Sequence, residues 1–201
     1  MAAAFDPTLR RCWWAPGEPM ARADPLMVTY HDEEWGRPLT DDRALFEKLS
    51  LDAFQAGLSW SIVLHKRQAL RAAFAGFQPE IMADFGPDDV ARMLADPGII
   101  RNRAKIAAMI GNARRYLEVQ AETGSFAAYL ASFAEQPPRR LPPEATRADV
   151  PATSPASDAL AADLRRRGWR FTGSTVVYAF MQAVGLVDDH LPTCYRYAGP
   201  G

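Results

Sequence analysis

The sequence has few cysteines, no long apolar run and no signal-peptide pattern. Each of these shortages argues against one class of protein: disulfide-bonded, membrane-spanning or exported. Cys12 and Cys194 are the only cysteines among 201 residues. In an intracellular chain such a pair is expected to bind a metal rather than to form a disulfide. No apolar run approaches the roughly 20 residues that span a bilayer, and residues 1–9 lack the basic-then-apolar pattern of a signal peptide. We therefore expect a cytoplasmic protein without a membrane partner.

The chain also has almost no net charge and no pattern typical of strands or internal repeats. A formal net charge of −1 argues against a protein that coats nucleic acid without specificity, although it allows a local basic face. Hydrophobic residues make up 48% of the chain and charged residues 23%, a composition typical of a globular protein. We expect an all-α fold in one domain over residues 10–197, with a flexible tail at 1–9 and another tail at 198–201.

Apolar residues recur at helical spacing along much of the chain. One helix is expected to begin after Thr40 or Asp41 as its N-cap, and another after Ser157 as its N-cap. The latter is expected to cover Asp158–Arg167; the other expected helices cover Trp60–Phe74, Pro87–Met93, a stretch from about Arg103, Phe126–Phe133 and Ser174–Leu186. The proline-rich residues 136–157 have no helical period and are expected to form a surface loop.

The stretch Pro97–Lys105 is expected to contain the turn of a helical hairpin. Gly98 would adopt a backbone conformation closed to other residues, and the N–H groups that begin the second helix would face a phosphate. Arg101, Arg103 and Lys105 lie at the same end, so they and Gly98 are candidates for contact with a phosphate. A plain helical hairpin with a solvated basic face stays open as the alternative.

The stretch Leu51–Trp60 places one carboxylate, that of Asp52, among large apolar residues at the end of a helical run. An acid beside Trp60 in apolar surroundings suits a pocket for a flat polar or cationic ring. Gly57 breaks the helical period, and Leu58 follows the break. The alternative is a solvated or capping acid with Leu58 and Trp60 in the core, since aromatics at helical spacing usually belong to a core.

Cysteine and histidine spacing indicates a candidate metal site. His190 and Cys194 are four residues apart, so one helical turn or a tight loop can present both to one ion. Cys12 and His31 lie in a loop-rich region where the backbone can bring them together. The sum is a closed Cys₂His₂ set of the structural kind. Two free cysteines and surface histidines are the alternative.

Several longer segments resemble the bacterial DNA-3-methyladenine glycosylase I family, and the resemblance runs from about Arg11 to Cys194. The matching segments are C-W-W from Cys12, Y-H-D-E-E-W-G from Tyr30, Q-A-G-L-S-W from Gln55, G-I-I-R-N-R-A-K-I-A-A-M-I-G-N-A-R from Gly98, T-S-P-A-S-D-A-L from Thr153 and G-S-T-V-V-Y-A-F-M-Q-A-V-G-L-V-D-D-H from Gly173. The resemblance implies a helix-hairpin-helix DNA-binding motif at about Val90–Arg114. It also implies a structural zinc that ties the N- and C-terminal segments, with Cys12, His31, His190 and Cys194 at its ligand positions.

The resemblance further implies a base pocket in which Asp52, Tyr30 and Trp60 form the catalytic group. Trp60 would stack on the extruded base, and Tyr30 and Asp52 would bind its polar edge. The other substrate-binding residues implied are Trp14, Met27, Trp35 and Phe54. Leu58, after Gly57, would contact DNA by filling the gap left in the duplex.

Three positions depart from the family pattern. Asp52 stands where the family commonly has Glu, and Met27 where a Tyr is often found. Phe54 stands where a smaller or polar residue is common. We therefore expect a pocket that is retuned but acts on the same lesion.

The function implied is base-excision repair, in which N3-methyladenine is extruded from alkylated double-stranded DNA and removed by hydrolysis. The products would be free 3-methyladenine and an uncut strand. A non-catalytic, zinc-stapled helix-hairpin-helix module that only binds DNA is the alternative, but it leaves Tyr30, Asp52 and Trp60 without a role. We expect a monomer of the bacterial cytoplasm with structural Zn²⁺ as its cofactor.

Overall fold

The structure, a computed structural model, describes residues 6, 8–15 and 24–199. The chain divides into two compact units, each built from segments far apart in the sequence. Unit 1 comprises Met1–Pro38, Glu135–Pro151 and Gln182–Gly201, and unit 2 comprises Leu39–Ala134 and Ala152–Met181. The expected tails at 1–9 and 198–201 lie partly outside the described residues. The expected single domain over residues 10–197 stays a prediction.

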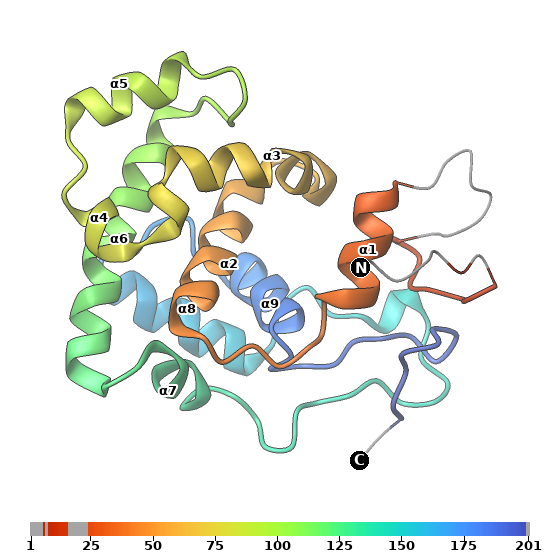
Figure 1. Ribbon diagram of the computed structural model, residues 1–201. Helices are drawn as coiled ribbons and strands as arrows, with labels where there is room; N and C mark the ends of the chain where they lie inside the picture. The colour runs from red at the N-terminus through yellow and green to blue at the C-terminus, as the bar shows by residue number, and fades with distance from the viewer. Residues whose placement is uncertain (1–5, 7, 16–23, 200–201) are drawn as a thin grey trace. The chain divides into compact units, whose positions relative to one another are not determined.

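The described residues are mostly helical and contain no sheet, which confirms the all-α prediction. Unit 1 contains α1 (Pro25–Glu33) and the 3-10 helix η3 (Arg147–Asp149). Unit 2 contains α2 (Asp42–Gln55), α3 (Trp60–Ala73), the 3-10 helix η2 (Ala75–Phe77), α4 (Pro79–Ala83), α5 (Pro87–Ala95), α6 (Arg103–Thr123), α7 (Phe126–Ala131) and α8 (Pro155–Arg166), and α9 (Ser174–Ala183) begins in this unit (Figure 1). Over the described ranges, no helix combines the length and the apolar character needed to cross a membrane.

Short polar side chains begin the main helices, and one of these caps, Asp41, was predicted from the sequence. The Asp41 carboxylate accepts a hydrogen bond from the Ala44 amide at 2.8 Å and caps α2. Ser59 caps α3 in the same way, and Asn102 caps α6 by accepting from the Lys105 amide at 3.1 Å. Such caps satisfy amide groups that have no partner within the helix.

Two expectations about helix ends are corrected, and one helix was missed. The N-cap of α8 is Ser154 rather than Ser157, because Pro155 suits the first helical position, where no N–H is needed. Ser157 instead lies in the first turn and accepts a hydrogen bond from the Ser154 amide at 2.8 Å. Helix α9 ends at Ala183 and not at Leu186. Helix α1 was not predicted at all, since its apolar residues do not form one continuous stripe.

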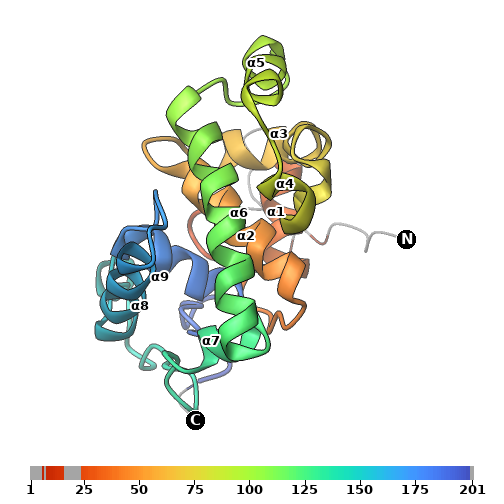
Figure 2. The same cartoon turned by 90° about the vertical axis from the view of Figure 1, so that its left-hand side faces the viewer.

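Helix α6 is the longest element of unit 2, and Figure 2 shows it running the length of that unit. An aromatic cluster packs beside it, in which the Phe126 ring stacks on Trp169 at 5.7 Å and lies 5.0 Å from Tyr116. The Asp42 carboxylate accepts hydrogen bonds from the Phe126 and Ala127 amides at 2.8 and 2.9 Å. The start of α7 is thereby tied to the start of α2.

Candidate functional site

A buried cluster in unit 1 contains the four predicted metal ligands. The ligand atoms of Cys12, His31, His190 and Cys194 all lie within 4.8 Å of one another. The Cys194 sulfur is 3.4 Å from His31 Nε2 and 3.6 Å from His190 Nδ1, and the Cys12 sulfur is 3.7 Å from His190 Nδ1. Two imidazole nitrogens and two sulfurs therefore converge on one point, and the cluster could hold a metal ion.

A carboxylate orients one of the two histidines. The Asp32 Oδ1 atom lies 2.8 Å from His31 Nδ1, which leaves Nε2 of the same ring facing the sulfurs. Arg11 binds both oxygens of Asp32, at 2.9 Å from Nε and 2.7 Å from Nη2. Burial raises the pKa of Asp32, but the hydrogen bonds from Arg11 and His31 outweigh it and hold the pKa below the ordinary value. Asp32 is thus ionised and fixed as the partner of His31.

The thiols of Cys12 and Cys194 differ in how easily each loses its proton. The Cys12 thiol donates to Cys194, which lowers the pKa of Cys194, while this bond and burial raise the pKa of Cys12. The pair therefore gives up its first proton, from Cys194, more easily than its second. Binding a metal cation requires the second proton to leave as well.

Bulky rings and one glycine close the cluster on other sides. The Trp35 ring meets His190 edge-on at 4.6 Å between centroids, and Trp14 lies 5.0 Å from Trp35 and 6.1 Å from Tyr30. Gly36 has a φ of +71°, and a Cβ added there would come within 3.0 Å of His190 Nε2. The predicted pocket residues Trp14, Tyr30 and Trp35 are therefore part of the packing around the metal cluster in unit 1. Met27 lies on α1 and is half-buried.

The predicted hairpin is present in unit 2 as α5, a tight turn and α6. The Gly98 amide donates to Asp96 Oδ1 at 2.7 Å, and Lys66 Nζ donates to the carbonyls of Pro97 and Gly98 at 3.0 and 2.9 Å. Gly98 does not adopt a positive φ, so the expected conformational reason for this glycine is wrong. It is required for space, because a Cβ would lie 2.9 Å from Asp96 Oδ1 and 3.2 Å from Ala69 Cβ.

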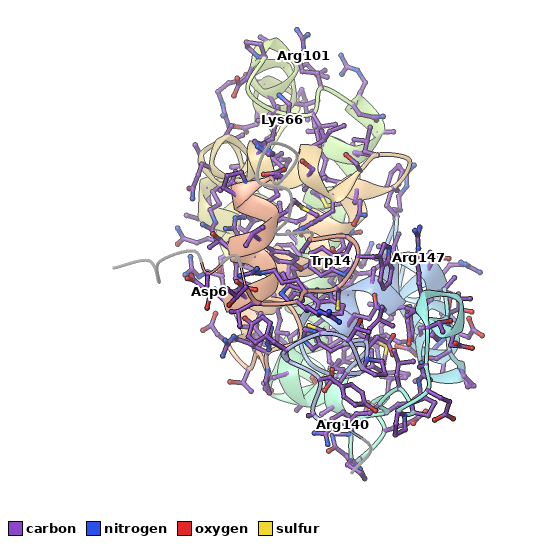
Figure 3. All side chains as sticks on the ribbon, turned by 90° about the vertical axis from the view of Figure 1, so that its right-hand side faces the viewer. Asp6, Trp14, Lys66, Arg101, Arg140 and Arg147 are labelled. Atoms are coloured by element: carbon purple, nitrogen blue, oxygen red, sulfur yellow. The ribbon has the colours of Figure 1, made fainter. Side chains whose placement is uncertain are left out.

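The three basic residues of the hairpin do not share one environment. Arg101 and Arg103 are exposed, and Figure 3 shows Arg101 at the tip of the unit with Lys66 below it. Lys105 is 5% exposed, and its ammonium donates to the carbonyls of Phe54 at 2.8 Å and Ala56 at 2.6 Å. Lys105 therefore fastens the end of α2 to the start of α6, which corrects the expectation that it faces DNA.

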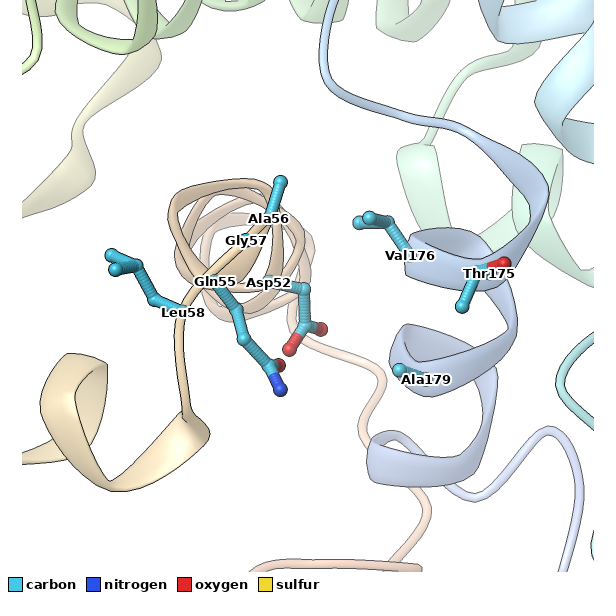
Figure 4. Close-up of a pocket in the computed structure, with 8 residues that line it drawn as sticks. All are labelled: Asp52, Gln55, Ala56, Gly57, Leu58, Thr175, Val176 and Ala179. Carbon is cyan, nitrogen blue, oxygen red and sulfur yellow. The ribbon is translucent and has the colours of Figure 1, made fainter.

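Asp52 lines a cavity of about 210 Å³ in unit 2, between the end of α2 and the start of α9. The other lining residues are Gln55, Ala56, Gly57, Leu58, Thr175, Val176 and Ala179. Figure 4 shows the Asp52 carboxylate and the Gln55 amide directed to the same side of α2. Burial raises the pKa of Asp52, and the charge of Lys48 acts in the opposite direction.

Lys48 is a member of this site that the sequence analysis did not identify. It precedes Asp52 by one helical turn, and its ammonium forms a short ion pair with Asp52 Oδ1. The same nitrogen lies 4.1 Å from the centroid of the Trp60 ring. The spacing of four residues on α2 is the signal that could have found it.

Three neighbours of Asp52 take different positions. Gly57 has a φ of +75°, which lets the chain turn sharply after α2 and leaves Leu58 37% exposed. Phe54, predicted to bind substrate, is fully buried and its ring lies 5.6 Å from Phe74. Phe54 therefore belongs to the core of unit 2, because its side of α2 faces Phe74 rather than the cavity.

Comparison with known proteins places the chain in a family. The family model described as methyladenine glycosylase matches residues 20–197. The chain is 44% identical over 191 residues to DNA-3-methyladenine glycosylase 1 of Escherichia coli, covering 95% of this chain and 98% of that protein.

The chain is also similar to two solved structures. A crystal structure of 3-methyladenine DNA glycosylase I has 45% identity and a TM-score of 0.87, covering 94% of this chain and 100% of that one. A variant of 3-methyladenine DNA glycosylase I in complex with 3-methyladenine has 34% identity and a TM-score of 0.82, covering 89% of this chain and 97% of that one. The chain therefore belongs to the methyladenine glycosylase family.

Proposed function

We propose that the protein is a DNA glycosylase of base-excision repair that removes N3-methyladenine from alkylated DNA by hydrolysis. The observation that carries this proposal is the 44% identity to a DNA-3-methyladenine glycosylase across nearly the full length of both chains. Support also comes from a relative of the same fold that holds 3-methyladenine in its crystal structure. Double-stranded DNA with alkylated adenine is then the substrate, free 3-methyladenine the product, and a monomer the expected form.

The chemistry asks little of the protein beyond extrusion and recognition of the base. Methylation at N3 gives the nucleoside a positive charge, so the base departs as a neutral leaving group while the sugar develops oxocarbenium character. Extrusion costs a few kcal/mol of unstacking, and a damaged base lowers that cost. The protein must then hold the base and exclude the undamaged one.

Asp52, Trp60 and Tyr30 are the residues we propose to hold the extruded base. A carboxylate in a buried setting and an aromatic face are both favourable partners for a cationic ring. Trp35, Trp14 and Met27 are proposed to complete the binding residues. Phe54 is not included, because it is fully buried against Phe74.

Leu58 and the hairpin are proposed to contact the DNA itself. Leu58 is exposed after the turn at Gly57, as an apolar side chain must be if it fills the gap in the duplex. Arg101 and Arg103 lie exposed at the start of α6, where amide groups and the helix dipole favour a phosphate. Such contacts position the protein without reading sequence.

The metal cluster of unit 1 is proposed to hold one zinc ion in a structural role. A tetrahedral ion with ordinary zinc–sulfur and zinc–nitrogen bonds separates sulfur from nitrogen by about 3.6 Å. The sulfur-to-nitrogen distances of 3.4, 3.6 and 3.7 Å support this fit. Four protein ligands complete the tetrahedron, so the ion would supply stability rather than an activated water. It would tie two segments, Met1–Pro38 and Gln182–Gly201, of the same unit.

The first test is release of free base from duplex DNA treated with a methylating agent. The released bases are separated by chromatography, and the DNA is examined for strand breaks before and after alkali. We expect 3-methyladenine in solution and breaks after alkali treatment alone. A protein that binds the DNA and releases no base would instead be the non-catalytic module.

The absence of strand cleavage is tested by trapping with borohydride. Strand-cleaving glycosylases form a Schiff base between an amine and the sugar, and borohydride turns this link into a stable adduct. Lys48 is an amine near the proposed base site, and in this structure its nitrogen forms an ion pair with Asp52. We expect no covalent adduct with DNA, and an adduct abolished by Lys48→Met would contradict hydrolysis by water alone.

A further inference from the structure

One ammonium group already occupies the two partners that we propose for the cationic base. Lys48 Nζ forms an ion pair with Asp52 Oδ1 and lies over the face of Trp60 at 4.1 Å from the ring centroid. The side chain of Lys48 is 13% exposed and that of Asp52 is 2% exposed. The carboxylate is therefore shielded from water and the ammonium largely so, and the ammonium faces the same carboxylate and ring that we propose for the base.

We propose that Lys48 is a specificity-determining residue, an internal cation that competes with the positively charged base for Asp52 and Trp60. The proposal rests on the proposed base-binding role of these two residues. A cationic base must displace the ammonium before it can use both the carboxylate and the aromatic face. A neutral base makes no such demand, because a neutral ring gains little from either charge-assisted contact.

The geometry favours competition over a purely structural ion pair. An i, i+4 pair needs only the carboxylate, and an exposed pair of this kind contributes little to stability. Here the carboxylate is buried, and the ammonium also lies over an aromatic ring, the second contact that a cationic ligand would use. Competition for both groups lowers the affinity for cations relative to neutral ligands of the same shape. A structural pair would change protein stability and leave that ratio untouched.

Removal of the charge at equal side-chain length tests the proposal directly. Lys48→Met is compared with the parent for binding of 3,9-dimethyladeninium, a permanent cation, and of neutral 9-methyladenine, by calorimetry at about pH 8 so that carboxylates are ionised. We expect the ratio of cation to neutral affinity to rise by about tenfold or more, as expected when a charged competitor leaves. An unchanged or lower ratio would overturn the proposal.

Arg43→Met is the matched control for the loss of one positive charge. Arg43 also lies on α2, but its guanidinium donates to the carbonyl of Gly76 at 3.3 Å, away from Asp52. We expect the affinity ratio of this variant to equal that of the parent. An equal rise in both variants would assign the effect to the net charge of the protein and not to Lys48.

A second measurement uses the unaltered protein and does not depend on the stability of a variant. The sequence contains three lysines, Lys48, Lys66 and Lys105, so ¹³C-labelled lysine gives a spectrum that can be assigned with one variant each. Protons over an aromatic face resonate upfield, and we expect this for the Cε protons of Lys48. On saturation with 3,9-dimethyladeninium they should move to the position of a solvated lysine. Lys48 signals that stay upfield in the saturated complex would refute displacement.

Different results would contradict the competition by Lys48 and the proposed glycosylase function. A parent protein that releases no 3-methyladenine from alkylated DNA contradicts the glycosylase function, whatever Lys48 does. A parent protein that releases the base, with an affinity ratio insensitive to Lys48→Met, contradicts only the competition.

Discussion

The Oδ1 atom of Asp32 lies 2.8 Å from Nδ1 of His31, and this contact turns the other ring nitrogen toward Cys194. A carboxylate that holds a ligand histidine raises the basicity of the ring and fixes its orientation. We expect Asp32→Asn to lower zinc affinity by about 10–100-fold, measured by competition with a chromophoric chelator. Glu33→Gln, one residue further along α1 and exposed, should bind zinc like the parent. Equal affinities for all three proteins would mean that Asp32 does not support the site.

Gly36 lies against the other ligand histidine, and its substitution should disturb the metal site through the backbone. Gly36→Ala forces a Cβ to within 3.0 Å of His190 Nε2 at a φ of +71°. A left-handed conformation at a residue other than glycine costs about 1–3 kcal/mol, so we expect a loss of stability of at least this size, measured by denaturant unfolding, together with weaker zinc binding.

Gly111→Ala is the control for the same substitution without crowding. A Cβ at Gly111 meets nothing within 4 Å, and the residue lies inside α6. Alanine in a helix interior is favoured over glycine by about 0.5–1 kcal/mol, so this variant should be more stable than the parent. Two glycine variants that change stability by the same amount would contradict the close approach at His190.

Lys105 and Arg103 should separate the roles of stability and DNA binding at the start of α6. Lys105→Met leaves the carbonyls of Phe54 and Ala56 without their buried donor, so we expect a loss of about 1–3 kcal/mol in the free energy of unfolding. Arg103→Met removes an exposed charge and should change stability by less than about 0.5 kcal/mol. Its DNA affinity should fall, and the salt dependence of binding should weaken by about one phosphate contact. Equal effects on DNA binding and stability in both variants would contradict this division.

The sequence predicted the parts of the structure that depend on local pattern. Asp41 begins α2 and Gly98 marks the hairpin because capping and tight turns are governed by a few adjacent residues. The spacing of Cys12, His31, His190 and Cys194 indicated a closed ligand set but left free cysteines and surface histidines open, and the resemblance to the family assigned all four to one site. The choice between Ser154 and Ser157 as N-cap failed because both serines are capable caps and Pro155 decides between them.

The features that the sequence did not predict depend on what lies across the fold from a residue. Lys105 reads as a basic hairpin residue, but its amine reaches carbonyls about 50 positions earlier in the chain. Phe54 lies two residues from Asp52, but its ring faces Phe74 and the core. The sequence around Lys48 is typical of a solvated helix residue, and only the structure shows that its ammonium lies over the Trp60 ring. Helical periodicity indicates which residues share one face of a helix. Tertiary packing decides which other segment of the chain contacts that face.

Asp52 should control recognition of the base through its charge. Asp52→Asn keeps the size of the side chain and removes the charge, so we expect base release from methylated DNA to fall by about tenfold or more, the value of a charge-assisted hydrogen bond. Binding of undamaged DNA should be unchanged, because Asp52 is 2% exposed and cannot reach a phosphate. Base release equal to that of the parent would remove Asp52 from the site.

The pH dependence of base release should report the ionisation of the same carboxyl group. Burial raises the pKa of Asp52 above its ordinary value of 3.8, so the protonated and inactive form accumulates, as pH falls, sooner than for an exposed Asp. The charge of Lys48 acts in the opposite direction and lowers this pKa. Lys48→Met should therefore move the acidic limb of kcat/KM for base release to higher pH. Arg43→Met, which removes a charge elsewhere on α2, should leave the limb in place. An acidic limb that does not move in Lys48→Met would mean that Asp52 is not the titrating group.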